Sequence, residues 1–172
     1  PNILVAVSGQ HTFTSSEGFF LLEGLPVGIH HLVAYSIDGA YMPFQQGASI
    51  GAGATTPASF SLKPAAYAQI TFNVRPPANS ISGAPIRLIG NIYQLGNTFA
   101  DLNGGVSTIA SRAPYMIRKT DGTYSLSLKL PAGLDLKYKY SLGDGFWNAE
   151  HTANGNFKVR QLIIPAQDST IE

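Results

Sequence analysis

The sequence predicts an all-β protein built from two consecutive antiparallel β-sandwich domains. Short runs of β-branched and aromatic residues recur along its 172 residues, each bounded by Gly, Pro, Asn or Asp. No window longer than about ten residues shows the 3.6-residue apolar period of a helix. Charged residues make up only 12% of the chain, about half of the ~25% that is usual in globular proteins. Turn-forming Gly, Ser, Thr, Asn and Pro take their place, as in a β-protein with many tight turns.

The expected strands follow from these runs in chain order. They cover residues 2–7, 19–25, 30–37, 59–62, 69–74, 85–90, 124–130, 136–142 and 160–165. The single helical candidate is a short turn at residues 97–105, which begins at Asn and ends at Gly. Residues 45–56 are small and lack a phosphate-loop lysine, so we interpret them as a connection or an edge segment.

A domain boundary is expected at residues 64–67, where Pro-Ala-Ala separates two strand-like runs. The predicted domains are residues 1–64 and 67–172, and the short bridge favours contact between them. Residues 17–39 and 121–145 share one pattern, an acid-Gly turn, a strand, Leu-Pro-x-Gly and a second strand. Each predicts a β-hairpin, because Pro presets φ and Gly takes the positive φ of the turn.

Composition excludes several classes of function. The net charge is +1 without a basic cluster, so nucleic acid and anionic lipid are not expected partners. There is no cysteine, which excludes a thiol nucleophile and a Cys-ligated zinc. No apolar run approaches the ~18 residues of a membrane-spanning helix. The adjacent His30 and His31 would point to opposite faces of a strand, so we expect neither a metal site nor a cofactor.

Residues 3–63 resemble the carboxypeptidase regulatory-like (transthyretin-like) family. The resemblance rests on Thr-x-Thr-Ser-Ser-Glu-Gly-Phe-Phe-Leu-Leu-Glu-Gly-Leu-Pro-Val-Gly at residues 12–28 and on the alternating strand that follows. It implies a prealbumin-like sandwich that is not catalytic and acts as a spacer or docking aid beside enzymes. Because the family has a strand before the "PNILVAV" run, we expect the chain to be a fragment that lacks this strand.

Residues 68–165 resemble a starch-binding domain of carbohydrate-binding module family 20. Four ordered segments carry the resemblance, namely "QITFNV", "IRLIGNIYQLGN", "YSLSLKLPAGLDLKYKYS" and "GFWNAE". It implies an immunoglobulin-like sandwich that binds α-glucans. It also implies a parent protein that is secreted or displayed on the cell surface by bacterial-type export, with neighbouring domains as further partners.

The resemblance assigns the sugar-binding residues. Proteins hold a sugar ring by laying an aromatic plane on its C–H face, with polar groups at the hydroxyl rim. The second tryptophan of the family's site matches Trp147, its lysine matches Lys139, and an aromatic of its other site matches Tyr124. The first tryptophan is replaced by Thr98, and Phe99 is the nearest substitute. Asn97, Asn148 and Glu150 complete the expected carbohydrate-binding set.

Each of these residues also has an ordinary structural interpretation. Trp147 could pack in a core or between domains, and Lys139 could be a plain solvent-facing residue. Tyr124 could pack across strands, and Asn97 and Asn148 could form turns. The acids are scattered and many sit beside glycine in turns, so we expect no pair of carboxylates to face a common cleft and no catalysis. The sequence therefore predicts a non-catalytic module pair that binds carbohydrate. The alternative is a structural or protein-docking tandem with an eroded sugar site.

Overall fold

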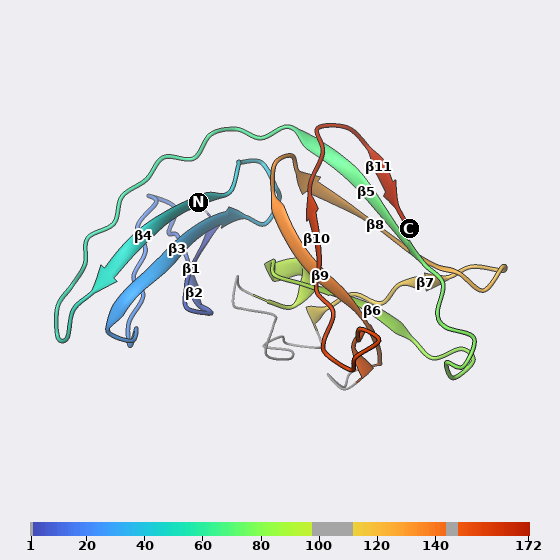
Figure 1. Ribbon diagram of the computed structural model, residues 1–172. Coiled ribbons are helices and arrows are strands. Elements are labelled where there is room, and N and C mark those ends of the chain that lie inside the picture. Colours follow the sequence, from blue (N-terminus) through green and yellow to red (C-terminus); the bar gives the residue numbers. More distant parts are fainter. Residues whose placement is uncertain (1, 98–111, 144–147) are drawn as a thin grey trace.

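The computed structural model describes residues 2–97, 112–143 and 148–172, and it confirms the all-β class (Figure 1). The first half contains one antiparallel sheet in the order β2-β1-β3-β4. Its strands are β1 (Ile3–Val7), β2 (Gln10–Phe13), β3 (Gly28–Ser36) and β4 (Phe44–Ile50).

The second half is a sandwich of two sheets. One sheet has the order β10-β9-β6 and the other β11-β5-β8-β7. The elements are β5 (Tyr67–Val74), β6 (Ile86–Gly90), the 3-10 turn η1 (Tyr93–Leu95), β7 (Ile117–Arg118), β8 (Tyr124–Pro131), β9 (Asp135–Leu142), β10 (Arg160–Ile163) and β11 (Ser169–Ile171). The hairpin expected in residues 121–145 is present as β8 and β9, closed at Pro131 by the N–H of Leu134.

Several expectations for the strands were wrong. Residues 19–25 and 59–62 have strand-like sequences, but neither joins a ladder. The first half is therefore one sheet covered by irregular segments and not a two-sheet sandwich, and its first predicted hairpin does not form. The second half is not purely antiparallel, because β11 runs parallel to β5. Asp168 Oδ1 accepts the N–H of Gln69 at 2.8 Å and fixes the start of this pairing.

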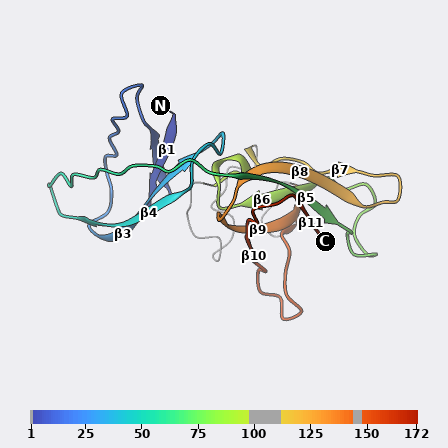
Figure 2. The same cartoon turned by 90° about the horizontal axis from the view of Figure 1, so that it is seen from above.

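The two halves share one apolar core. Leu4, Ala6 and Tyr35 face away from the irregular cover of the first sheet and belong to the same buried cluster as Ile70 and Leu136. Figure 2 shows the two groups of strands lying end to end, with the η1 region between them. The halves are thus in contact, while the exact boundary at residues 64–67 stays a prediction.

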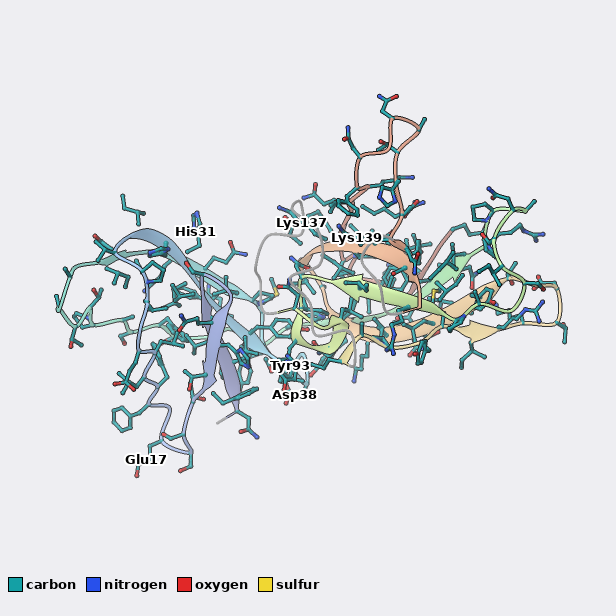
Figure 3. The ribbon with its side chains drawn as sticks, turned by 90° about the horizontal axis from the view of Figure 1, so that it is seen from below. Glu17, His31, Asp38, Tyr93, Lys137 and Lys139 are labelled. Atoms are coloured by element: carbon teal, nitrogen blue, oxygen red, sulfur yellow. The ribbon has the colours of Figure 1, made fainter. Side chains whose placement is uncertain are left out.

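Specific contacts align the halves at this junction. Gln94 Nε2 donates to the Ile37 carbonyl at 2.6 Å and to the Tyr35 hydroxyl at 3.2 Å. Burial raises the pKa of Tyr35 to about 12. The Tyr93 ring meets the His11 and Phe13 rings edge-on, with centroids 5.8 and 5.7 Å away. Figure 3 shows Tyr93 near Asp38, at the turn that follows β3.

The two histidines lie on opposite sides of β3. His30 uses both ring nitrogens, Nδ1 with Ser8 Oγ at 2.7 Å and Nε2 with the Pro26 carbonyl at 2.8 Å. His31 is exposed. Within the described ranges no three His, Cys, Asp or Glu side chains gather as metal ligands. No helix in these ranges is long and apolar enough to cross a membrane.

Candidate carbohydrate-binding site

A groove of about 370 Å³ lies at the end of β9 and contains two of the predicted binding residues, Asn148 and Glu150. We call it the Glu150 groove. It is lined by Val74, Arg75, Pro76, Pro77, Ser80, Ile86, Tyr140, Ser141, Leu142, Asn148, Ala149, Glu150, His151 and Arg160. The lining mixes apolar ring surfaces with an amide, a carboxylate and two guanidinium groups, which is the composition that a sugar needs.

The backbone fixes the segment that carries Asn148 and Glu150. The Glu150 N–H donates to the Tyr140 carbonyl at 2.8 Å, and the Lys158 N–H donates to the Glu150 carbonyl at 2.8 Å. Ala149 forms an isolated bridge with Ser141 of β9. Ala149 and Glu150 are therefore held along β9 by one isolated bridge and one backbone hydrogen bond, and Asn148 lies exposed just before them.

Glu150 is bound by two cations. Arg160 donates from Nε to Oε2 at 2.8 Å and from Nη2 to Oε1 at 2.6 Å, a bidentate pair. Lys158 Nζ lies 3.1 Å from Oε1. Burial acts most strongly on the pKa of Glu150 and raises it, but the hydrogen bonds from Arg160 and Lys158, with their charges, bring the net pKa below the usual value.

Arg160 also connects Glu150 to the aromatic residues of β9. Its guanidinium carbon lies 5.4 Å from the centre of the Tyr140 ring, and Tyr138 and Tyr140 meet edge-on at 5.8 Å. Burial is the main cause of the raised pKa of Tyr140, whose phenol therefore stays neutral. A second groove of about 420 Å³ shares Arg75, Tyr140 and Arg160 with the first.

Trp147 and Phe99 lie outside the described residues. Trp147 directly precedes Asn148 in the chain. The helical turn expected at residues 97–105 also lies outside the described part, except for Asn97.

Lys139 is fully buried in β9, so neither the expected sugar contact nor the solvent-facing alternative fits its position. Its Nζ lies 5.0 Å from the centre of the Phe157 ring. Alternation along β9 places Lys139 opposite Tyr138 and Tyr140 as expected, but chain segments cover both faces of this strand. Figure 3 shows Lys139 and Lys137 on one strand; Lys137, unlike Lys139, is exposed.

Tyr124 and Asn97 are also buried. Tyr124 is 4% exposed within the shared core, and its hydroxyl donates to the Ala84 carbonyl at 2.9 Å. It has no free ring face for a sugar, so the cross-strand packing interpretation is the one that fits. Asn97 is 1% exposed, and its N–H donates to the Ile92 carbonyl at 3.2 Å in the turn after η1.

The sequence interpretation missed the other residues of the groove, above all Arg160, Arg75 and Tyr140. Arg160 begins a run that was correctly predicted as a strand. Its contact with Glu150 depends on the β9–β10 register, in which Arg160 lies opposite Tyr138. Nothing in the sequence joins the two residues, because Arg160 follows Glu150 by ten positions.

Comparisons with known proteins give distant structural likenesses only. No protein-family model matches the chain, and no curated protein sequence matches it. The chain is similar to a glycoside hydrolase family 15 glucoamylase from Hypocrea jecorina, with 18% identity, a TM-score of 0.44 and coverage of 61% of this chain and 17% of the glucoamylase. It is also similar to a gamma-CGTase from alkalophilic Bacillus clarkii, with 14% identity, a TM-score of 0.42 and coverage of 98% and 22%.

A third likeness is to the TIE protein of Bacillus anthracis, with 15% identity, a TM-score of 0.33 and coverage of 99% of this chain and 29% of that protein. The chain thus spans between 17% and 29% of the length of these proteins. At these TM-scores the likenesses carry no information on function.

Proposed function

We propose that residues 67–172 form a non-catalytic carbohydrate-binding module that binds α-glucan chains at the Glu150 groove. The observation that carries the proposal is the placement of Asn148, Glu150 and Arg160 in one groove, where Asn148 directly follows Trp147 in the chain. The ordered resemblance to starch-binding domains supports the choice of α-glucan.

The polar groups of the groove suit the hydroxyl rim of a glucose unit. Glu150 engages two of the five N–H donors of Arg160, so the guanidinium has further donors for hydroxyl oxygens. Oε2 of Glu150 accepts one of these bonds and keeps a lone pair for a hydroxyl proton. The amide of Asn148 can both donate and accept, and it is exposed.

Trp147 is proposed to supply the aromatic plane, with Pro76 and Pro77 adding apolar surface. Thr98 stands where the family has its other tryptophan, and the buried positions of Tyr124 and Lys139 remove two further expected contacts. A sugar held by one aromatic plane binds more weakly than one held by two, so we expect weak binding to single chains. The apparent affinity for a polymer would be higher, because one polymer chain presents many binding positions.

The proposed role is binding without hydrolysis. Hydrolysis of a glycosidic bond requires a carboxylic acid that carries a proton near neutral pH. Glu150 is held as a carboxylate by Arg160 and Lys158, which is the opposite condition. We place the parent protein outside the cell or on its surface, with the first half as a spacer to neighbouring domains.

Titration with β-cyclodextrin tests the proposal, with tryptophan fluorescence and calorimetry as readouts and retention on amylose as a second assay. Wild type should show a fluorescence shift, and Trp147→Ala and Asn148→Ala should lose at least tenfold in affinity without a change in the unfolding transition. Phe19→Ala is the matched control, because Phe19 is 73% exposed in the first half and should not alter binding. No shift and no retention for wild type would exclude glucan binding, and unfolding of Trp147→Ala would place Trp147 in the core.

The second candidate is a structural or docking tandem with an eroded sugar site. The burial of Tyr124 and Lys139 and the core shared by both halves favour it. In that case the wild-type protein would bind neither soluble nor insoluble glucans, although its unfolding would remain cooperative across both halves.

A further inference from the structure

A third groove, of about 640 Å³, lies on the first half, far along the chain from the Glu150 groove. Its floor is the apolar face of the first sheet, from Val7, Leu32, Ala48 and Ile50. One wall is residues 20–25 and the other is residues 51–58. We call it the first-sheet groove.

Two stretches of the covering segments, residues 20–22 and 58–62, alternate in burial like strands, whereas residues 51–57 are exposed throughout. Phe20 and Leu22 are half-buried against the sheet, whereas Leu21 is exposed. Residues 58–62 repeat this alternation, with Ala58 and Phe60 inward. A period of two is the pattern of a strand with one face buried.

Neither segment has the partner that a strand requires. In the described chain, no hydrogen bond involves the backbone of residues 20–23 or 57–62, whereas β1 and β3 are paired along their lengths. The two segments touch through the Phe20 and Phe60 rings, whose centroids are 5.7 Å apart, so they are positioned as flanks of one layer. Unpaired extended edges are templates for an added strand.

The charge of this half is one-sided. All eleven Lys and Arg residues follow residue 62, whereas Glu17, Glu23 and Asp38 precede it, so the first 62 residues carry no Lys or Arg. Among the residues that the structure describes, Glu23 is the only charged one that lines the first-sheet groove. Figure 3 shows Glu17 at the tip of the loop that leads into residues 20–25. A ligand with a positive charge at this end complements the surface.

We propose that the first-sheet groove binds an extended peptide strand of a partner protein by β-strand addition. The strand has about six residues, the length of the wall at 20–25, and spans about 20 Å at the usual rise. Its alternate apolar side chains point to the floor, its backbone pairs with the unpaired residues 20–23 of the wall, and a Lys or Arg lies beside Glu23. Main-chain pairing supplies affinity in this mode of recognition, and the alternate side chains supply specificity.

The test uses a fluorescently labelled peptide with one lysine followed by alternating valine and threonine, added to the complete chain. Binding is followed by anisotropy, and amide hydrogen exchange maps the contact. We expect saturable binding and slower exchange of the amides of residues 20–25. We also expect at least tenfold weaker binding when the same residues are reordered to break the alternation, or when alternate peptide nitrogens are methylated.

Variants of the protein locate the site. Phe20→Asp should abolish binding, whereas Phe19→Asp, on the exposed side of the same segment, should not. Since Phe20→Asp could unfold the half, Glu23→Gln is the second variant, and we expect severalfold weaker binding with a smaller salt dependence.

Three results would overturn the proposal. The first is equal binding of the ordered and reordered peptides. The second is the absence of protection in residues 20–25. The third is protection of these residues by self-association in the absence of peptide, which would make a second copy of this chain the occupant.

Discussion

Arg160 binds Glu150 through two hydrogen bonds, from Nε to Oε2 and from Nη2 to Oε1, at 2.8 and 2.6 Å. The pair joins the first residue of β10 to the segment that follows Trp147 and borders the proposed sugar site. It therefore contributes both to local stability and to the shape of the Glu150 groove, and a mutation of the pair should change both.

Replacing Arg160 by lysine should keep the positive charge but lose the bidentate pair of hydrogen bonds to Glu150. We expect a loss of about 1 kcal/mol in the free energy of unfolding, because one strong bidentate contact becomes a single one at a partly exposed site. β-Cyclodextrin affinity should fall severalfold. Chemical denaturation and calorimetric titration measure the two effects. Lys158→Gln is the control and should change stability by less than about 0.5 kcal/mol, since the Lys158 side chain is 42% exposed.

The stabilisation by Glu150 should disappear in acid. The pKa of Glu150 is lower in the folded protein than its usual value, so the unfolded chain binds the proton first as the pH falls. The stabilising contribution is complete above the unfolded pKa of about 4.3, and it is lost as the pH drops through the folded pKa.

Melting temperatures of wild type and Glu150→Gln should therefore differ at pH 7 and converge as the pH falls from about 4.5 to 3. The comparison cancels the other carboxylates, including Asp38 and Asp121, whose pKa values are also lowered. A constant difference between the two proteins from pH 7 to pH 3 would show that the Glu150 charge contributes nothing to folding.

Tyr124 should behave as a core residue and not as a sugar platform. Tyr124→Phe removes only the hydrogen bond to the Ala84 carbonyl, for which we expect a loss of about 1 kcal/mol. Tyr124→Ala leaves a cavity and should cost about 3–5 kcal/mol. Neither change should alter the β-cyclodextrin affinity of the folded protein, and a drop for Tyr124→Phe would return this residue to the binding site.

Strands with apolar alternation and clear turn boundaries could be predicted from the sequence. Residues 69–74 and 136–142, for example, fall within β5 and β9. β2 and β4 could not, because Gln-His-Thr-Phe and the small-residue run around Gly47 lack the alternation that marks a strand. Residues 19–25 are a strand-like apolar run that forms no ladder, since pairing depends on a neighbour that the local sequence does not specify.

The residues of the candidate site could likewise be predicted only in part from the sequence. Asn148 and Glu150 were predicted from their place after Trp147, and they line the groove. Arg160 was missed because its approach to Glu150 depends on the β9–β10 register. Lys139 is buried with its Nζ 5.0 Å from the centre of the Phe157 ring, a contact between distant parts of the sequence that no local pattern reveals.

The packing at the junction between the halves predicts that a larger residue in place of Gly39 destabilises the protein. Its φ of +72° disfavours any residue with a Cβ, and an added Cβ would lie 2.8 Å from the Tyr67 ring, a residue of β5 in the other half. Gly155 has a similar φ of +80° with open space around it, so it measures the backbone cost alone.

Gly155→Ala should lose about 1 kcal/mol of stability, and Gly39→Ala should lose a further ~1–3 kcal/mol, because the Tyr67 ring must move within the packed junction. At this chain length each kcal/mol lowers the melting temperature by about 2–4 °C, so calorimetry can resolve the difference. Combining Gly39→Ala with Tyr67→Ala should remove the excess cost, because the two residues would then no longer collide. If both glycine variants lose equal stability, Tyr67 does not pack on Gly39 in solution, and the halves meet less closely than the shared core indicates.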